Sequence, residues 1–416
     1  MKIKCSLTAR RSRVEFVLLI TLCLLLVAPV PLRAQQSQAP AQDDERTHAL
    51  KLLWQESRAE DALPLLEKLA EANPNDGIVM FSLGFALFGH TKILKDASER
   101  QQTRIRARGA LLRAKELGVT EPLLDSLLSS LPADGGKDDV FSENKEADGA
   151  MRDGEAAYVR GDFAAAAAAY QRALQADPKL YAAALFAGDM YYKLKQPDRA
   201  GEWFARAIAL NPDAETAYRY WGDALLLAGQ QTEARDKFID AIVAEPGNDL
   251  AYSGLTQWGK NNGIALAHPQ IDVPTNVTPM QDNKLTINID PKMLDSKNKN
   301  DPAAAWMMYG LTRAAWATQK FAKEYPQEQT YRHTLREETE ALHAVAQSAH
   351  ELLKGRTPSD PSLANLLKLD DAGLLEPYIF FNRADKGIMQ DYAAYRRANH
   401  DKLHRYWVEF VVHEAK

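Results

Sequence analysis

Histidines near the C-terminus are the side chains whose spacing comes nearest to a metal site. His400 and His404 are four residues apart, which places both imidazoles on one face of a helix. Glu340 and His343 have the Glu-x-x-His spacing of dinuclear carboxylate bundles, and His350 follows two turns later. Side chains of this kind bind zinc or iron when they converge.

A dinuclear site requires that motif on two helices and two further glutamates, and residues 302–416 contain the motif once. Both histidine pairs flank apolar helix stripes, where a histidine commonly covers the edge of a core. We therefore interpret them as surface or core-edge histidines and predict no metal and no cofactor. The alternative is a metal-binding or enzymatic C-terminal helical bundle with the rest of the chain as a docking arm.

The sequence contains none of the compact motifs that mark common catalytic sites. It has no G-x-x-x-x-G-K phosphate loop, no G-x-G-x-x-G loop after a strand and no G-x-S-x-G elbow. Its two cysteines, Cys5 and Cys23, lie close to the N-terminus. We predict that the protein is not an enzyme.

The N-terminus has the layout of a secretory signal peptide. A head rich in lysine and arginine precedes an apolar run over 16–30, and Ala34 follows as the expected cleavage point. The run is shorter than the roughly 20 residues of a membrane-spanning helix, so we predict a cleaved leader at 1–34 and no membrane span afterwards. The localisation would be periplasmic or extracellular; the alternative is an N-terminal anchor in the inner membrane.

Removal of this leader changes the charge and the redox chemistry of the chain. The remaining chain has 45 basic and 55 acidic residues, so the net charge changes from −5 to −10, and both cysteines are lost. An acidic exported protein is a poor candidate for a nucleic-acid binder, and we predict no nucleic-acid partner.

The centre of the chain repeats with a period of 34 residues in segments that begin at Ala147, Tyr181 and Glu215. Small, aromatic and proline residues recur at fixed places, and each type has a packing role. Small residues let two helices approach, the aromatic fills the space between them, and the proline ends the second helix. The recurring sets are Gly154, Gly188 and Gly222; Ala166, Ala200 and Ala234; Tyr170, Phe204 and Phe238; Ala173, Ala207 and Ala241; and Pro178, Pro212 and Pro246.

This pattern resembles the tetratricopeptide repeat (TPR), and the resemblance implies a solenoid of paired helices. We expect an all-α protein in which a TPR-type solenoid is followed by a helical bundle, with a short irregular, strand-containing connection. The expected segments are degenerate repeats with a capping helix at 43–132, a linker at 133–146, three tight repeats and a closing half-repeat at 147–263, a proline-rich connection at 264–301 and the helical domain at 302–416. An eleven-residue insertion between Gly84 and Ala107 is rich in basic residues, and we predict a solvated helix there.

The resemblance also implies which side chains face the concave groove of the repeats. These candidate groove residues are Met151, Glu155, Tyr158, Leu185, Asp189, Tyr192, Lys193, Arg219 and Asp223. They predict an acidic groove edged by aromatic rings, suited to a peptide with basic and apolar side chains. The alternative is that the carboxylates are ordinary solvated helix residues. The family's lysine and asparagine clamp for a C-terminal carboxylate is not expected, because acids occupy the corresponding places.

After the repeats, Lys284–Asp290 alternates with a period of two residues, which predicts one short strand. Helical periodicity returns at 302–416 and predicts four or five helices of a separate bundle. We therefore predict a non-catalytic, exported scaffold that binds a protein or peptide partner through its repeats. The bundle would supply a second surface or a homo-oligomer contact; a spacer that binds nothing specific is the remaining alternative.

Overall fold

The computed structural model describes residues 40–136, 140–281, 284–289 and 303–414. The chain divides between Pro212 and Asp213 into two compact units, and each is described by itself. The predicted leader 1–34 and the end of the connection, 290–301, lie outside the described residues. Among the helices that are described, none combines the length and the apolarity needed to cross a bilayer.

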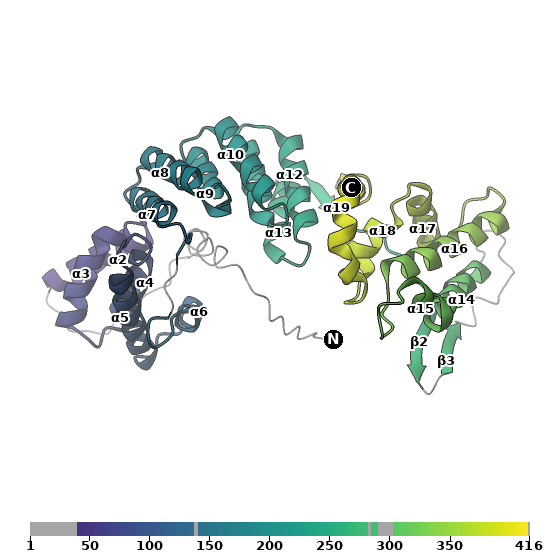
Figure 1. The fold of residues 1–416 in the computed structure, drawn as a ribbon, viewed down its shortest axis with the longest axis horizontal. Helices are drawn as coiled ribbons and strands as arrows, with labels where there is room; N and C mark the ends of the chain where they lie inside the picture. The colour runs from purple at the N-terminus through teal and green to yellow at the C-terminus, as the bar shows by residue number, and fades with distance from the viewer. Residues whose placement is uncertain (1–39, 137–139, 282–283, 290–302, 415–416) are drawn as a thin grey trace. The chain divides into compact units, whose positions relative to one another are not determined.

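The first unit is built from consecutive helices that pack as pairs (Figure 1). The pairs are α2 (Pro40–Trp54) with α3 (Ala59–Ala72), α4 (Gly77–His90) with α5 (Ala97–Glu116), α7 (Lys145–Val159) with α8 (Phe163–Ala176), and α9 (Tyr181–Lys193) with α10 (Pro197–Leu210). A further helix, α6 (Pro122–Ser130), buries Leu124 and Leu127 against the core of the first two pairs. This is the arrangement that the repeat pattern predicts.

Glycines set the close approach of the two helices within each tight repeat. A Cβ added to Gly154 would lie 2.3 Å from the ring of Tyr170, and one added to Gly188 would lie 2.6 Å from the ring of Phe204. Both distances are far below van der Waals contact, so only glycine fits beneath these rings. The recurring glycine and aromatic residues therefore form one packing contact, repeated at every 34-residue step.

The inserted segment forms part of a long second helix, α5, and two of its arginines are buried where a solvated helix was predicted. Helix α5 has 20 residues, whereas α8 and α10 have 14. Arg100 is 3% exposed and donates to the carbonyl of Lys95 at 2.7 Å; Arg104 is 7% exposed and donates to the carbonyl of Gly135 at 2.5 Å. The prediction of a solvated helix was wrong at these two positions, because their guanidinium groups donate to backbone carbonyls in the segments before α5 and after α6, whereas Arg106 is exposed.

The second unit contains the third tight repeat and everything after it. It begins with α11 (Glu215–Leu227), α12 (Gln231–Ala244) and α13 (Asp249–Asn262). The later helices are α14 (Met307–Ala315), α15 (Phe321–Glu324), α16 (Leu335–Leu353), α17 (Pro361–Asp371), α18 (Leu375–Tyr378) and α19 (Tyr392–Tyr406). Single turns occur at η2 (Ala303–Trp306), η3 (Trp316–Lys320), η4 (Ile379–Arg383), η5 (Ile388–Asp391) and η6 (Trp407–Val411). The predicted all-α architecture of solenoid and helical bundle is confirmed.

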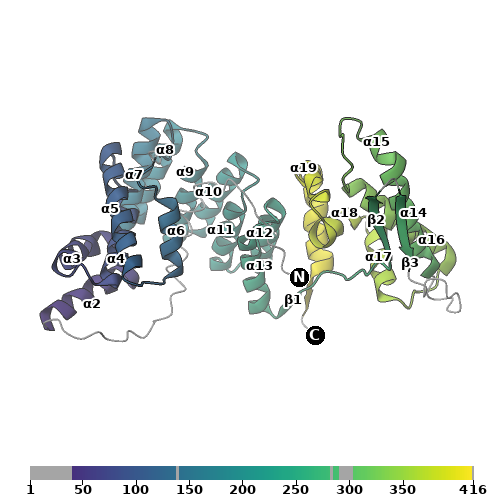
Figure 2. The ribbon, with the colours of Figure 1, turned by 90° about the horizontal axis from the view of Figure 1, so that it is seen from below.

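Strands within the described residues form two small antiparallel pairs. The predicted strand at 284–290 is confirmed as β3 (Lys284–Ile289), and its partner is β2 (Thr275–Gln281), beside α14 (Figure 1). The register shifts between Thr278 and Gln281, where Pro279 has no N–H to donate to the ladder. The other pair joins β1 (Ile264–Leu266), directly after α13, to β4 (Val412–Glu414) near the C-terminus (Figure 2).

The last repeat and the C-terminal helices share one hydrophobic core. Its buried members run from Ala234 on α12 to Val411 at the end of the second unit. Tyr392 on α19 donates to the carbonyl of Val243 at 2.7 Å, and Arg396 donates to that of Ala244 at 2.5 Å. Helix α19 therefore caps the carbonyl end of α12, where a solenoid would otherwise leave polar groups and an apolar face uncovered.

Candidate functional site

The candidate site in the first unit is formed by the first helices of two tight repeats, α7 and α9. We call the part formed by Glu155, Tyr158, Asp189, Tyr192 and Lys193 the α7–α9 surface. Its two carboxylates occupy equivalent places on the two helices, one 34-residue period apart, and both are half-buried. Lys193 is exposed, and the two tyrosines are half-buried. The period of the repeat thus brings two acidic and two aromatic side chains to one surface.

The ionised form of Glu155 is disfavoured at this surface. Burial raises the pKa of Glu155, and the charge of Asp189 adds to the rise, although Tyr170 and Lys92 act in the opposite direction. Burial also raises the pKa of Asp189, against the influence of Lys193. Two half-buried carboxylates that repel each other are held here without enough positive charge to restore their ordinary pKa.

Tyrosine hydroxyls complete the surface. Tyr170 fills the space beneath Gly154 and donates its hydroxyl to Glu155 Oε1 at 2.7 Å. Burial raises the pKa of Tyr158 to about 12, and the neighbouring carboxylates of Asp189 and Glu155 contribute. Sequence reasoning assigned Tyr170 only a packing role. The signal was available, because the other two repeats place phenylalanine there and a buried hydroxyl needs a partner.

Several predicted groove residues have another role in the structure. Met151 and Leu185 are fully buried, so they support α7 and α9 and offer no side-chain surface to a partner. In the second unit, Arg219 is 6% exposed and forms a two-bond ion pair with Glu215 at 2.8 and 3.0 Å. Because this ion pair lies within α11, the guanidinium of Arg219 is already bound to a side chain of its own helix. Asp223, half-buried on α11, is the third member of the acidic series and belongs to the second unit.

The C-terminal histidines that could have formed a metal site each face a carboxylate. His400 Nε2 and His404 Nε2 lie 3.5 and 3.9 Å from Asp240 Oδ1 on α12. His343 Nδ1 lies 2.7 Å from Asp370 Oδ1. His350 and Glu340 are likewise engaged, the former with Asp371 at 3.2 Å and the latter with Lys320 and Trp316. Over the residues that the structure describes, no group of three or more such side chains is arranged to hold a metal ion.

A buried ionic cluster at the start of α16 was not anticipated from the sequence. Glu338 is 1% exposed, and its Oε2 accepts from Tyr309 Oη at 2.7 Å and contacts His333 Nε2 at 3.1 Å. Arg383 Nε donates to Glu338 Oε1 at 2.8 Å, and Arg313 Nη1 lies 3.4 Å from Oε2. Burial by itself would raise the pKa of Glu338, but His333, Arg383 and Arg313 lower it to about 2.

The neighbouring carboxylate, Glu337, is also fully buried and accepts from Arg313 at 2.5 Å and Tyr331 at 2.7 Å. His333 is held on its other side by Asp385 at 3.0 Å. Because the imidazole contacts a carboxylate through each nitrogen, neither nitrogen is left for a substrate. The cluster joins α14, α16 and the segment after α18, and its geometry is that of a structural network.

Comparison with known proteins identifies the repeats. A family model described as tetratricopeptide repeat matches residues 152–215 and 204–249. The first TPR of Spaghetti (RPAP3), bound to an HSP90 peptide, is 22% identical over 29% of this chain and 98% of that chain, with a TM-score of 0.27. The MamA protein is 18% identical over 49% of this chain and 92% of its own chain, with a TM-score of 0.25. A thermophilic TPR protein from Thermus thermophilus, TTC0263, is 19% identical over 53% of this chain and 97% of its own chain, with a TM-score of 0.25.

No curated protein sequence matches the chain. The family match nevertheless covers the segments in which the glycine, aromatic and proline places recur, and it ends at residue 249. The structure packs those segments as the helix pairs that the repeat requires. Residues 152–249 are therefore tetratricopeptide repeats.

Proposed function

We propose that this protein is an exported, non-catalytic scaffold that binds a protein or peptide partner through the α7–α9 surface. Tetratricopeptide repeats are a protein-interaction fold, which supports the general role. The observation that carries the proposal is the pair Glu155 and Asp189, two half-buried carboxylates with raised pKa values beside Tyr158. Export rests on the leader pattern at 1–34, and the non-catalytic role on the lack of a catalytic motif in the sequence.

The electrostatics of the surface favour a cationic side chain in the partner. A raised carboxylate pKa means that ionisation is unfavourable in the free protein, and a bound lysine or arginine would offset that cost. Tyr158 adds an aromatic ring on which a cation or an apolar side chain can rest. The partner segment we propose therefore combines basic and apolar residues.

Quantitative capture from the native cell envelope tests this proposal. The immobilised mature protein is compared with a double variant, Glu155→Gln with Asp189→Asn, and with a control, Glu202→Gln, on the exposed side of α10. We expect the wild-type protein and the control to recover the same partner, and the double variant to recover about tenfold less, because a charge pair across an interface contributes at least about 1.4 kcal/mol. Equal recovery with the double variant would remove the α7–α9 surface from the function.

Acidification supplies a second readout of the same carboxylates. Because the pKa values of Glu155 and Asp189 are raised, binding should weaken at a higher pH than ordinary surface carboxylates would require.

Export is tested separately by the mass of the protein in each cell fraction. A soluble chain that begins near Gln35 would support cleavage, whereas a full-length chain in the membrane fraction would favour the anchored alternative.

A further inference from the structure

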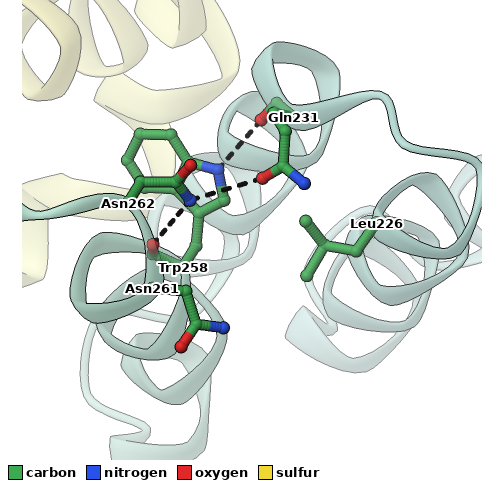
Figure 3. A pocket seen from close by; sticks show the side chains of 5 residues that line it. All are labelled: Leu226, Gln231, Trp258, Asn261 and Asn262. Carbon is green, nitrogen blue, oxygen red and sulfur yellow. Dashed lines mark hydrogen bonds between the residues drawn. The ribbon is translucent and has the colours of Figure 1, made fainter.

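A hollow of about 260 Å³ lies in the second unit, between the ends of α11 and α13 and the start of α12. Its lining consists of Leu226, Gln231, Trp258, Asn261 and Asn262 (Figure 3). Three of these side chains are carboxamides, two are apolar or aromatic, and none is ionisable. The lining thus differs in kind from the acidic α7–α9 surface.

Hydrogen bonds fix the orientation of the three carboxamides. Asn262 Nδ2 donates to the carbonyl of Trp258 at 2.8 Å, and this acceptor determines the orientation of the Asn262 amide. The same Nδ2 donates to Gln231 Oε1 at 3.3 Å, so Gln231 Nε2 points away from Asn262 (Figure 3). Asn261 Oδ1 accepts from Gln257 at 2.7 Å, which leaves its Nδ2 as a donor.

Side chains that line the hollow therefore keep unpaired polar atoms. In the part of the chain that the structure describes, Gln231 Nε2, Asn261 Nδ2 and Asn262 Oδ1 have no hydrogen-bond partner in the protein. The indole of Trp258 is fixed beside them, because its Nε1 donates to the carbonyl of Gln231 at 3.0 Å. Two unpaired donors and one unpaired acceptor thus belong to side chains that line the hollow together with Leu226 and Trp258.

We propose that this hollow binds the carboxamide of an asparagine or glutamine side chain in a peptide segment of a partner protein. The ligand's carbonyl oxygen has two acceptor sites for Gln231 and Asn261, and its NH₂ group can donate to Asn262 Oδ1. Its methylene groups would contact Leu226 and Trp258. This site lies in the second unit and does not depend on the acidic surface of the first.

Other ligand classes fit the hollow less well. An ionised side chain would lose hydration without gaining an opposite charge from the lining. A sugar would require an accessible aromatic face for stacking, and Trp258 is only 7% exposed. A neutral group with both a donor and an acceptor matches the unpaired atoms.

Fluorine NMR of the full chain labelled with 5-fluorotryptophan tests the proposal. The chain has seven tryptophans, and loss of one signal in a Trp258→Phe variant assigns the resonance of Trp258. The probe is N-acetyl-glutamine methylamide, and its isosteric, charged counterpart is N-acetyl-glutamate methylamide. We expect a saturable shift of the Trp258 signal with the glutamine probe and at least about tenfold weaker binding of the glutamate probe, since an unmatched buried charge costs more than one hydrogen bond.

Two isosteric variants locate the binding. Gln231→Glu or Asn261→Asp should weaken the response to the glutamine probe about tenfold, because each replaces a donor by an acceptor. The control Gln390→Glu makes the same chemical change at an exposed position outside the hollow and should leave the response unchanged. The inference is overturned if the Trp258 signal shows no saturable shift, or if both probes give equal responses. It is also overturned if both variants respond as the wild type does, or if methyl glucoside gives a stronger response than the glutamine probe. None of these results would bear on capture through Glu155 and Asp189.

Discussion

Replacement of Glu338 by glutamine tests how much an ionic network stabilises the second unit. The folded protein lowers the pKa of this carboxyl from an ordinary value of 4.5 to about 2, and the side chain is 1% exposed. A difference of this size corresponds to about 3 kcal/mol of unfolding free energy at neutral pH. Because the folded-state pKa lies below the unfolded-state pKa, this stability is present above about pH 4.5 and is lost as the pH falls toward 2.

The variant Glu338→Gln should have two measurable effects. At neutral pH it should lower the unfolding free energy by about 3–5 kcal/mol, because Arg383 loses the carboxylate that offsets its charge in a largely buried site and Arg313 keeps only Glu337. It should also flatten the dependence of stability on pH between 4.5 and 2, because glutamine does not titrate. Urea unfolding followed by tryptophan fluorescence measures both, and hydrogen exchange of α16 peptides assigns the change to the second unit.

The matched control is Glu340→Gln, on the same helix. The side chain of Glu340 is 39% exposed and pairs with Lys320 at the surface, so its replacement should cost less than about 1 kcal/mol. Two outcomes would refute the reasoning: an equal cost for both variants, or a difference between wild type and Glu338→Gln that does not change between pH 4.5 and 2.

Three further outcomes follow from contacts in the two units. Gly188→Ala should lower the unfolding free energy of the first unit, measured by urea denaturation, by about 1–3 kcal/mol, because its Cβ would lie 2.6 Å from the ring of Phe204. The control Gly149→Ala, with open space around it, should stabilise α7 by about 0.5–1 kcal/mol. Tyr170→Phe removes a hydrogen bond that lowers the pKa of Glu155, so NMR titration of this carboxyl should show its midpoint at a higher pH. Arg396→Ala leaves a buried carbonyl unpaired and should speed hydrogen exchange at the end of α12 by about tenfold or more.

The repeats were predictable because their determinants are local and periodic. Gly154, Tyr170 and Pro178 lie within one repeat, and their types reappear at the same places 34 residues later. The strand at Lys284–Ile289 was also predictable from its alternation. Its partner was not, because β2 contains Pro279 and lacks a clear period of two.

The acidic series was predictable only as a position in the repeat. The 34-residue spacing places Glu155 and Asp189 at equivalent sites on the first helices of neighbouring repeats. Their raised pKa values depend on burial, on the hydroxyl of Tyr170 and on nearby charges, none of which the spacing specifies. The same spacing placed Met151 and Leu185 in the groove, but their burial shows that neighbouring helices cover them.

The sequence by itself determined the paired-helix repeats and the acidic residues on their first helices. Only the tertiary structure decided that the last repeat shares its core with the C-terminal helices, that Glu338 is an ionised buried carboxylate and that three carboxamides surround a hollow beside Trp258. The reason is the range of the contacts. A repeat records interactions between residues close in sequence, whereas these three features arise from side chains on helices that meet only when the chain has folded.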